Sequence, residues 1–136
     1  MESLPIAGEN GFVDFSVTVN GTETNQTQGL ALPDGFSGWV RCEVVGHVTT
    51  GDAETGVWMG QLKITAVRIG SGTIDIKAAS AHLPGFDFVS GNASNYEVAL
   101  VKVPGDGEKV CLSVGGGSEG DAATFDCRFF VTGTRP

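Results

Sequence analysis

Apolar and polar side chains alternate along most of the chain, most clearly in its first half. Three such runs follow one another, Gly38–Thr49, Val57–Ile69 and Thr73–Ala79. A period of two is typical of a β-strand that buries one face. Short glycine-rich segments at 51–56 and 70–72 separate the runs. The pattern therefore predicts three strands joined as a meander of antiparallel hairpins.

Four further runs alternate in the same way: Phe12–Val19, Tyr96–Val103, Lys109–Val114 and Ala123–Thr132. No segment combines a helix cap with an apolar period of about 3.6 residues. About seven strands with glycine turns predict an all-β fold, a single-domain antiparallel β-sandwich or jelly roll. We expect this domain to span 12–136 and an extended N-terminal arm to occupy 1–11.

Two long connections interrupt the strand pattern. Asn20–Ser37 contains a polar, threonine-rich stretch at Thr22–Gln28 and an apolar one at Leu30–Leu32, and it is predicted to be a long ordered loop with room for one short strand. Ser80–Asn95 contains Phe86, Phe88 and Val89. Either a short strand lies in this second loop, or the loop packs its aromatic side chains against a neighbour.

The composition and charge of the chain disfavour several classes of function. The chain has 136 residues, fits one domain, and carries a net charge of −8. This charge disfavours nucleic acid and anionic membranes as partners, because both bind Lys and Arg. There is no apolar run of about 20 residues and no signal-like N-terminus. We therefore expect neither a membrane span nor secretion.

The three cysteines are predicted to be reduced. Cys42 and Cys127 fall on core faces of their strands, whereas Cys111 falls on the opposite phase. An odd number of cysteines without a secretory signal favours buried free thiols. A Cys42–Cys127 disulfide is the alternative.

Candidate chemistry is sparse. His47 and His82 are far apart and there is no Cys-x-x-Cys, so a zinc site is not expected. The acidic turns are predicted to be solvated, since each offers two carboxylates and calcium takes about six to eight oxygens: Asp52 with Glu54, Asp106 with Glu108, and Glu119 with Asp121. Four strand acids are expected to keep polar faces wet: Asp14, Glu43, Asp75 and Asp126. We expect no catalytic residue, no metal and no cofactor.

Large apolar side chains also occur on the nominally outer faces of strands: Trp39, Val45, Val57, Met59, Val67, Ile69, Val101, Val103 and Phe130. A sandwich buries only one face of each sheet, so a second apolar face requires a second cover. Either the long loops provide this cover, or another subunit does. The candidate partner-binding residues come from the arm, this face and the second loop: Leu4, Pro5, Ile6, Trp39, Val57, Met59, Phe86 and Phe88.

Four segments carry a resemblance to a known type of domain: Trp39–Gly46, Gly56–Leu62, Lys109–Gly117 and Thr124–Val131. Their order, a strand with an acidic glycine turn, a tryptophan strand and a final hairpin, resembles a β-domain of tailed-bacteriophage virion proteins, found in tail fibres and on head surfaces. The resemblance covers about residues 38–132. Where that domain often has tryptophan in the last strand, this chain has Phe125.

The resemblance implies a non-enzymatic virion protein that is assembled in the host cytoplasm. Its partners would be further copies of itself, often in a trimer, and the major capsid protein or other virion proteins. The expected role is a capsid decoration (cement) protein that stabilises the head shell from outside, with the N-terminal arm clamping the lattice. The alternative is a tail-fibre or receptor-binding tip whose long loops contact the host, with Trp39 or Tyr96 as a sugar platform. A small carbohydrate-active enzyme is the remaining class, but it lacks a carboxylate pair of defined geometry.

Overall fold

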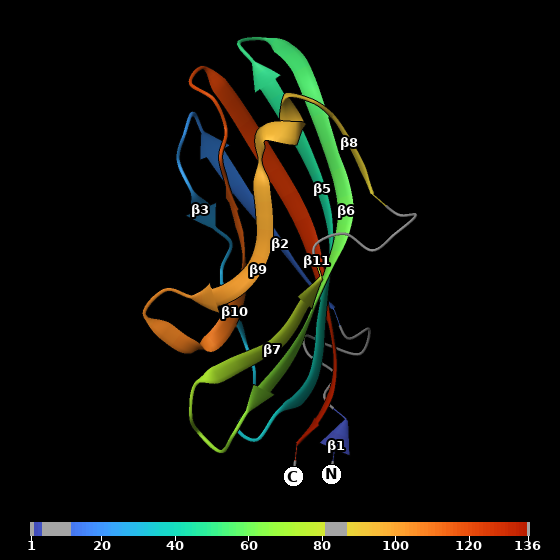
Figure 1. Ribbon diagram of the computed structural model, residues 1–136, viewed down its shortest axis with the longest axis vertical. Coiled ribbons are helices and arrows are strands. Elements are labelled where there is room, and N and C mark those ends of the chain that lie inside the picture. The colour runs from blue at the N-terminus through green and yellow to red at the C-terminus, as the bar shows by residue number, and fades with distance from the viewer. Residues whose placement is uncertain (1, 4–11, 81–86, 136) are drawn as a thin grey trace.

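The computed structural model describes residues 2–3, 12–80 and 87–135, and it is all-β with antiparallel strands in two sheets (Figure 1). The seven predicted strands are present as β2 (Phe12–Asn20), β5 (Ser37–Thr50), β6 (Ala53–Arg68), β7 (Ile74–Ser80), β9 (Glu97–Val103), β10 (Asp106–Gly115) and β11 (Asp121–Arg135). The predicted all-β sandwich is therefore confirmed. No described helix is long and apolar enough to cross a membrane.

Four short strands add to the predicted set: β1 (Glu2–Ser3), β3 (Asn25–Gln26), β4 (Leu30–Ala31) and β8 (Phe88–Gly91). The first long loop thus holds two short strands rather than one. The second loop contains β8 and a turn of 3-10 helix, η1 (Asn92–Asn95). Strands of two residues contain no alternation, so the sequence pattern could not reveal β3 and β4.

The large sheet is built around three long strands in the order β11, β5, β6 (Figure 1). Strands β1 and β2 share the outer edge of β11, and β7 and β8 share the outer edge of β6. The small sheet has β10 at its centre, with β9 on one edge and β3 and β4 on the other. Of the predicted arm at 1–11, the structure describes only β1, which pairs with the C-terminal end of β11. Leu4, Pro5 and Ile6 lie outside the described residues.

The core lies between the two sheets and follows the predicted phase. On β5 every second side chain is buried from Val40 to Val48, and on β6 the same holds from Trp58 to Ala66. Phe125 and Phe129 on β11 are among the largest fully buried side chains. The first long loop also contributes to this core, because its apolar side chains are buried there: Leu30, Leu32 and Phe36.

All three cysteines are free and buried, as predicted. Burial raises the pKa of the Cys42 thiol and of the Cys111 thiol. Cys111 is fully buried although it lies out of phase with the core side chains of β10. The reactive thiolate is therefore disfavoured at Cys42 and Cys111, whereas the hydrogen bond with Cys42 lowers the pKa of Cys127, whose protection comes from its burial alone.

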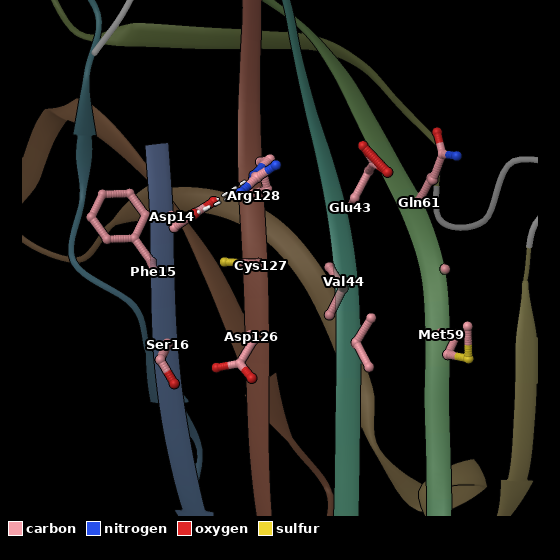
Figure 2. A pocket seen from close by; sticks show the side chains of 12 residues that line it. Asp14, Phe15, Ser16, Glu43, Val44, Met59, Gln61, Asp126, Cys127 and Arg128 are labelled. Atoms are coloured by element: carbon pink, nitrogen blue, oxygen red, sulfur yellow. Dashed lines mark hydrogen bonds and ion pairs between the residues drawn. The ribbon is translucent and has the colours of Figure 1, made fainter. Parts of the chain in front are cut away.

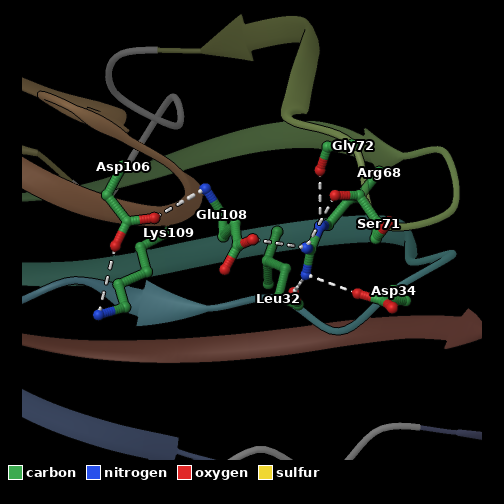
Figure 3. A network of polar contacts seen from close by, with 8 residues as sticks. All are labelled: Leu32, Asp34, Arg68, Ser71, Gly72, Asp106, Glu108 and Lys109. Atoms are coloured by element: carbon green, nitrogen blue, oxygen red, sulfur yellow. Dashed lines mark hydrogen bonds and ion pairs between the residues drawn. The ribbon is translucent and has the colours of Figure 1, made fainter.

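Arg68 ties one end of the sandwich together, although its side chain is almost fully buried (Figure 3). Its guanidinium donates hydrogen bonds to the carbonyls of Leu32 and Gly72, at 2.7 and 2.8 Å. It also forms ion pairs with Asp34 and Glu108, at 3.1 and 3.2 Å. These partners come from the first loop, the β6–β7 turn and β10, so one side chain joins both sheets.

Asp121 plays a similar part at another turn and is buried, 5% exposed. Its carboxylate accepts a hydrogen bond from the Thr50 hydroxyl at 2.6 Å. The Asn92 side-chain amide, in η1, also donates to it at 3.4 Å. The prediction that this turn acid is solvated was wrong, because the carboxylate is used to hold β5, β11 and η1 together.

Candidate functional site

The outer face of the large sheet, which points away from the small sheet, gathers most of the large exposed apolar side chains of the described chain, with charged side chains beside them. Cross-strand register orders this face in rows. The first row runs Phe12, Phe130, Arg41, Lys63; the second runs Asp14, Arg128, Glu43, Gln61; and the third runs Ser16, Asp126, Val45, Met59. Directly paired side chains lie about 4.5–5.5 Å apart at Cβ, so neighbours within a row interact.

One end of the face is a cation–aromatic cluster. The Arg41 guanidinium lies 4.4 Å above the Phe130 ring, and the Lys63 ammonium lies 4.7 Å above the Trp39 ring. Arg128 lies in the same way 4.0 Å above Phe12. Such contacts are attractive because the ring face carries negative charge. Each cation is therefore already engaged with a ring of its own chain.

An apolar patch lies further along the face. Val45 pairs with Met59, and Met59 pairs with Phe88 on β8. These three side chains are 41%, 43% and 58% exposed. Val57, half-buried on the same face, pairs with His47. We call Val45, Val57, Met59 and Phe88 the apolar patch.

The structure thus brings together three of the predicted partner-binding residues, Val57, Met59 and Phe88. Trp39, 47% exposed, lies on the same face but in the cation–aromatic cluster. Phe86 lies outside the described residues. The sequence pattern placed Asp14, Glu43 and Asp126 on polar strand faces, but it did not show that they lie beside these apolar residues.

Neither long loop covers the apolar patch with its described residues. The first loop pairs with β10 of the small sheet and fills the inner core. In the second loop, β8 extends the edge of the large sheet, and its own Phe88 is exposed. The described parts of the two long loops therefore do not support the expectation that these loops bury the apolar side chains of the outer face.

Between the patch and the cation–aromatic cluster lies an open depression of about 710 Å³. Figure 2 shows the side chains around it, which come from β2, β11, β5 and β6. Arg128 donates two hydrogen bonds to Asp14, from Nε to Oδ1 at 2.7 Å and from a terminal nitrogen to Oδ2 at 3.0 Å. This hydrogen-bonded ion pair lowers the pKa of Asp14 and raises that of Arg128.

Two other carboxylates line the same depression, those of Glu43 and Asp126 (Figure 2). Both residues are exposed, and neither carboxylate has a hydrogen bond or ion pair with a described side chain. Glu43 lies beside Arg128 in the second row, but Arg128 directs its nitrogens to Asp14. The depression therefore offers negative charge beside apolar surface.

The chemistry of this face suits non-covalent binding. A general acid needs a raised pKa in a site that excludes water, whereas the pKa of Asp14 is lowered and the depression is open. His47 contacts Glu54 at 3.2 Å, with no nucleophile in that pair. No group of three or more metal-ligating side chains occurs among residues 12–80 and 87–135.

The suggested sugar platform at Tyr96 was wrong. Tyr96 is buried, and its ring centroid lies 5.6 Å from that of Phe125 in the core. A signal for this was present in the sequence, since Tyr96 is in phase with the core residues Val98 and Leu100 of β9. Trp39 is the aromatic side chain of that pair that remains accessible.

No protein-family model matches the chain, and no curated protein matches it. Among solved structures, the chain is similar to the tailspike protein of Acinetobacter baumannii phage AM24, with 12% sequence identity and a TM-score of 0.47. The match covers 91% of this chain and 26% of the tailspike chain. This chain thus spans about a quarter of the tailspike's length.

Proposed function

We propose that this protein is a non-enzymatic structural protein of a bacteriophage virion, and more specifically a capsid decoration protein that binds the outer surface of the head shell and stabilises it. The outer face of the large sheet is the observation that carries the proposal. It is broad and open, and it presents exposed Met59, Phe88 and Trp39 among charged side chains. Exposed apolar side chains gathered on one face are typical of a protein–protein interface.

The resemblance of residues 38–132 to virion β-domains supports the virion setting of this proposal. A binding role also agrees with the chemistry of the face. Its best-defined ion pair, Asp14 with Arg128, fixes two neighbouring strands and holds both groups in their charged forms. Such a face would recognise a partner through shape, charge and apolar contact.

In this proposal the major capsid protein, or another virion protein, lies against the outer face. Self-association into a trimer stays a prediction to which no surface is assigned. Burial of the apolar patch would supply binding free energy at about 25 cal/mol per Å² of apolar area. The surrounding charges would set orientation and specificity.

A tail-fibre or receptor-binding tip is the second candidate, and exposed Trp39 is the observation that favours it. Its ring is about half exposed beside Lys63, and an exposed aromatic ring next to a cation suits stacking on a sugar. In that role the protein would bind host cells by itself and block infection.

Immunogold imaging of the purified virus particle tests both candidates. An antibody against the folded protein is applied to intact particles, and antibody pre-absorbed with free protein is the control. Label spread over the head is the expected result. Label confined to the tail would refute decoration and support the tail-tip role, and particles without label would refute both.

A further inference from the structure

We propose that the depression on the outer face docks a basic, apolar-bearing segment of a different protein, and not a second copy of this chain. This inference rests on the proposed function, because it states which chemistry the virion partner presents to the face. The segment would place a Lys or Arg against Glu43 and Asp126 and an apolar side chain against Val45 and Met59.

The charges of the face are the first step of the argument. The depression is lined by three carboxylates, those of Asp14, Glu43 and Asp126, and by one cation, Arg128, which is hydrogen-bonded to Asp14. Glu43 and Asp126 have no described ionic partner, and both line the depression. The side chains that line the depression therefore carry more negative than positive charge, so a partner segment docked there is expected to bring positive charge.

The arrangement of these groups is the second step. Asp126 pairs with Val45 across the strands, and Glu43 precedes Val45 by two positions on β5. Met59 completes the row on the other side of Val45. Alternate side chains along an extended chain are about 6.6 Å apart. An extended segment with a basic side chain at one position and an apolar side chain two positions further on, both on the same face, therefore matches the spacing of Glu43 and Val45 along β5.

The same charges argue against a second copy as the occupant. A copy of this chain placed face to face on the depression would bring its own Glu43 and Asp126 there, so carboxylates would meet carboxylates. The whole chain carries a net charge of −8. Like charges repel most strongly at low ionic strength, where screening is weak. A partner with its own lysines or arginines meets none of these costs.

The test uses the full-length protein and a fluorescein-labelled ten-residue peptide that repeats Lys-Ser-Val-Ser, so that lysine and valine alternate on one face of the extended chain. Two control peptides replace every lysine by glutamate or every valine by serine. Fluorescence anisotropy at low salt measures the affinity, and NMR shifts of the Met59 methyl group report where the peptide lies. We expect the Lys/Val peptide to bind and to shift the Met59 signal, and both control peptides to bind more weakly.

A pair of protein variants isolates the two carboxylates. Glu43→Gln with Asp126→Asn removes both charges from the depression and nearly preserves side-chain shape. Asp52→Asn with Glu119→Gln removes two exposed turn charges, so the net charge changes equally. We expect the first variant to weaken peptide binding on the order of 3- to 30-fold, as for two exposed ion pairs, and the matched variant by less than about 2-fold.

Three results would overturn the inference. They are equal binding of the Lys and Glu peptides, equal loss in the two variants, and a wild-type dimer in sedimentation that the Glu43/Asp126 variant strengthens. The last result would identify a second copy as the occupant. Failure of this inference is distinguishable from failure of the proposed function, because head labelling of particles does not depend on the two carboxylates.

Discussion

Gly46 lies directly opposite Phe125 in the pairing of β5 with β11, and replacing it with alanine is expected to destabilise the fold. The Phe125 ring is fully buried and occupies the space that a side chain at position 46 would need. A Cβ at position 46 would lie 2.8 Å from Cζ of Phe125 and closer still to Cδ2 and Cε2. Ordinary carbon–carbon contacts are about 3.5–4.0 Å, so the ring would have to move by about 1 Å or more.

The ring has little room to move, because the Trp58 and Tyr96 rings lie 6.2 and 5.6 Å from it, centroid to centroid. Overpacking of this kind lowers the free energy of unfolding by about 1–3 kcal/mol. Replacing glycine also reduces the entropy of the unfolded chain, which restores about 0.4–1 kcal/mol. Gly46→Ala is therefore expected to lose about 1–2 kcal/mol in net terms.

Urea unfolding followed by tryptophan fluorescence measures this change as a lower midpoint with an unchanged m-value. The double variant Gly46→Ala/Phe125→Leu is the control, since a smaller side chain at 125 makes room for the new methyl group. The two changes should be non-additive, with the double variant losing about 1 kcal/mol less than the sum of the single variants. A Gly46→Ala protein as stable as wild type, or strictly additive effects, would refute the packing argument.

Four further outcomes are expected. Leu62→Ala should lower the free energy of unfolding, measured in urea, by about 2–5 kcal/mol, because it leaves a cavity in the core. Arg68→Lys should lower the same free energy by about 1–3 kcal/mol, because one ammonium cannot replace the forked hydrogen bonds of a guanidinium. Asp14→Asn should lower the melting temperature at neutral pH but not in acid: the folded pKa of Asp14 is lowered by Arg128, so its contribution is present above the unfolded pKa of about 3.9 and is lost as pH falls through the folded pKa. A thiol reagent such as DTNB should react with none of the cysteines in the native protein and with all three after unfolding; native reactivity would contradict their burial.

The long strands could be predicted because their burial follows the pattern of the sequence. On β6 the same alternation that places Leu62 and Ile64 in the core also places Arg68 there, so its burial could have been read from the phase. Its partners could not, because Leu32 is 36 residues away and lies in a loop without periodicity.

Asp121 shows the limit of local patterns more clearly. Its sequence neighbours are glycine, alanine and acidic residues, which are typical of a solvated turn. It is buried because Thr50 and Asn92, which are 71 and 29 residues away, donate hydrogen bonds to its carboxylate. A buried carboxylate is tolerated when such donors surround it. Only the assembled fold brings these donors to one place.

The exposure of the outer face of the large sheet could not be predicted from the local sequence pattern either. The alternation of β5 and β6 shows that Val45 and Met59 lie opposite the core, but a face covered by a loop and a face open to a partner have the same sequence pattern. The two cases differ in where the first loop forms its backbone hydrogen bonds. In this protein β3 and β4 of that loop pair with β10 of the small sheet. This pairing places the loop strands in the small sheet, away from the outer face of the large sheet. The register places Arg128 between Asp14 and Glu43, and its side-chain hydrogen bonds go to Asp14, so the charges of this face depend on contacts between strands that are far apart in the sequence.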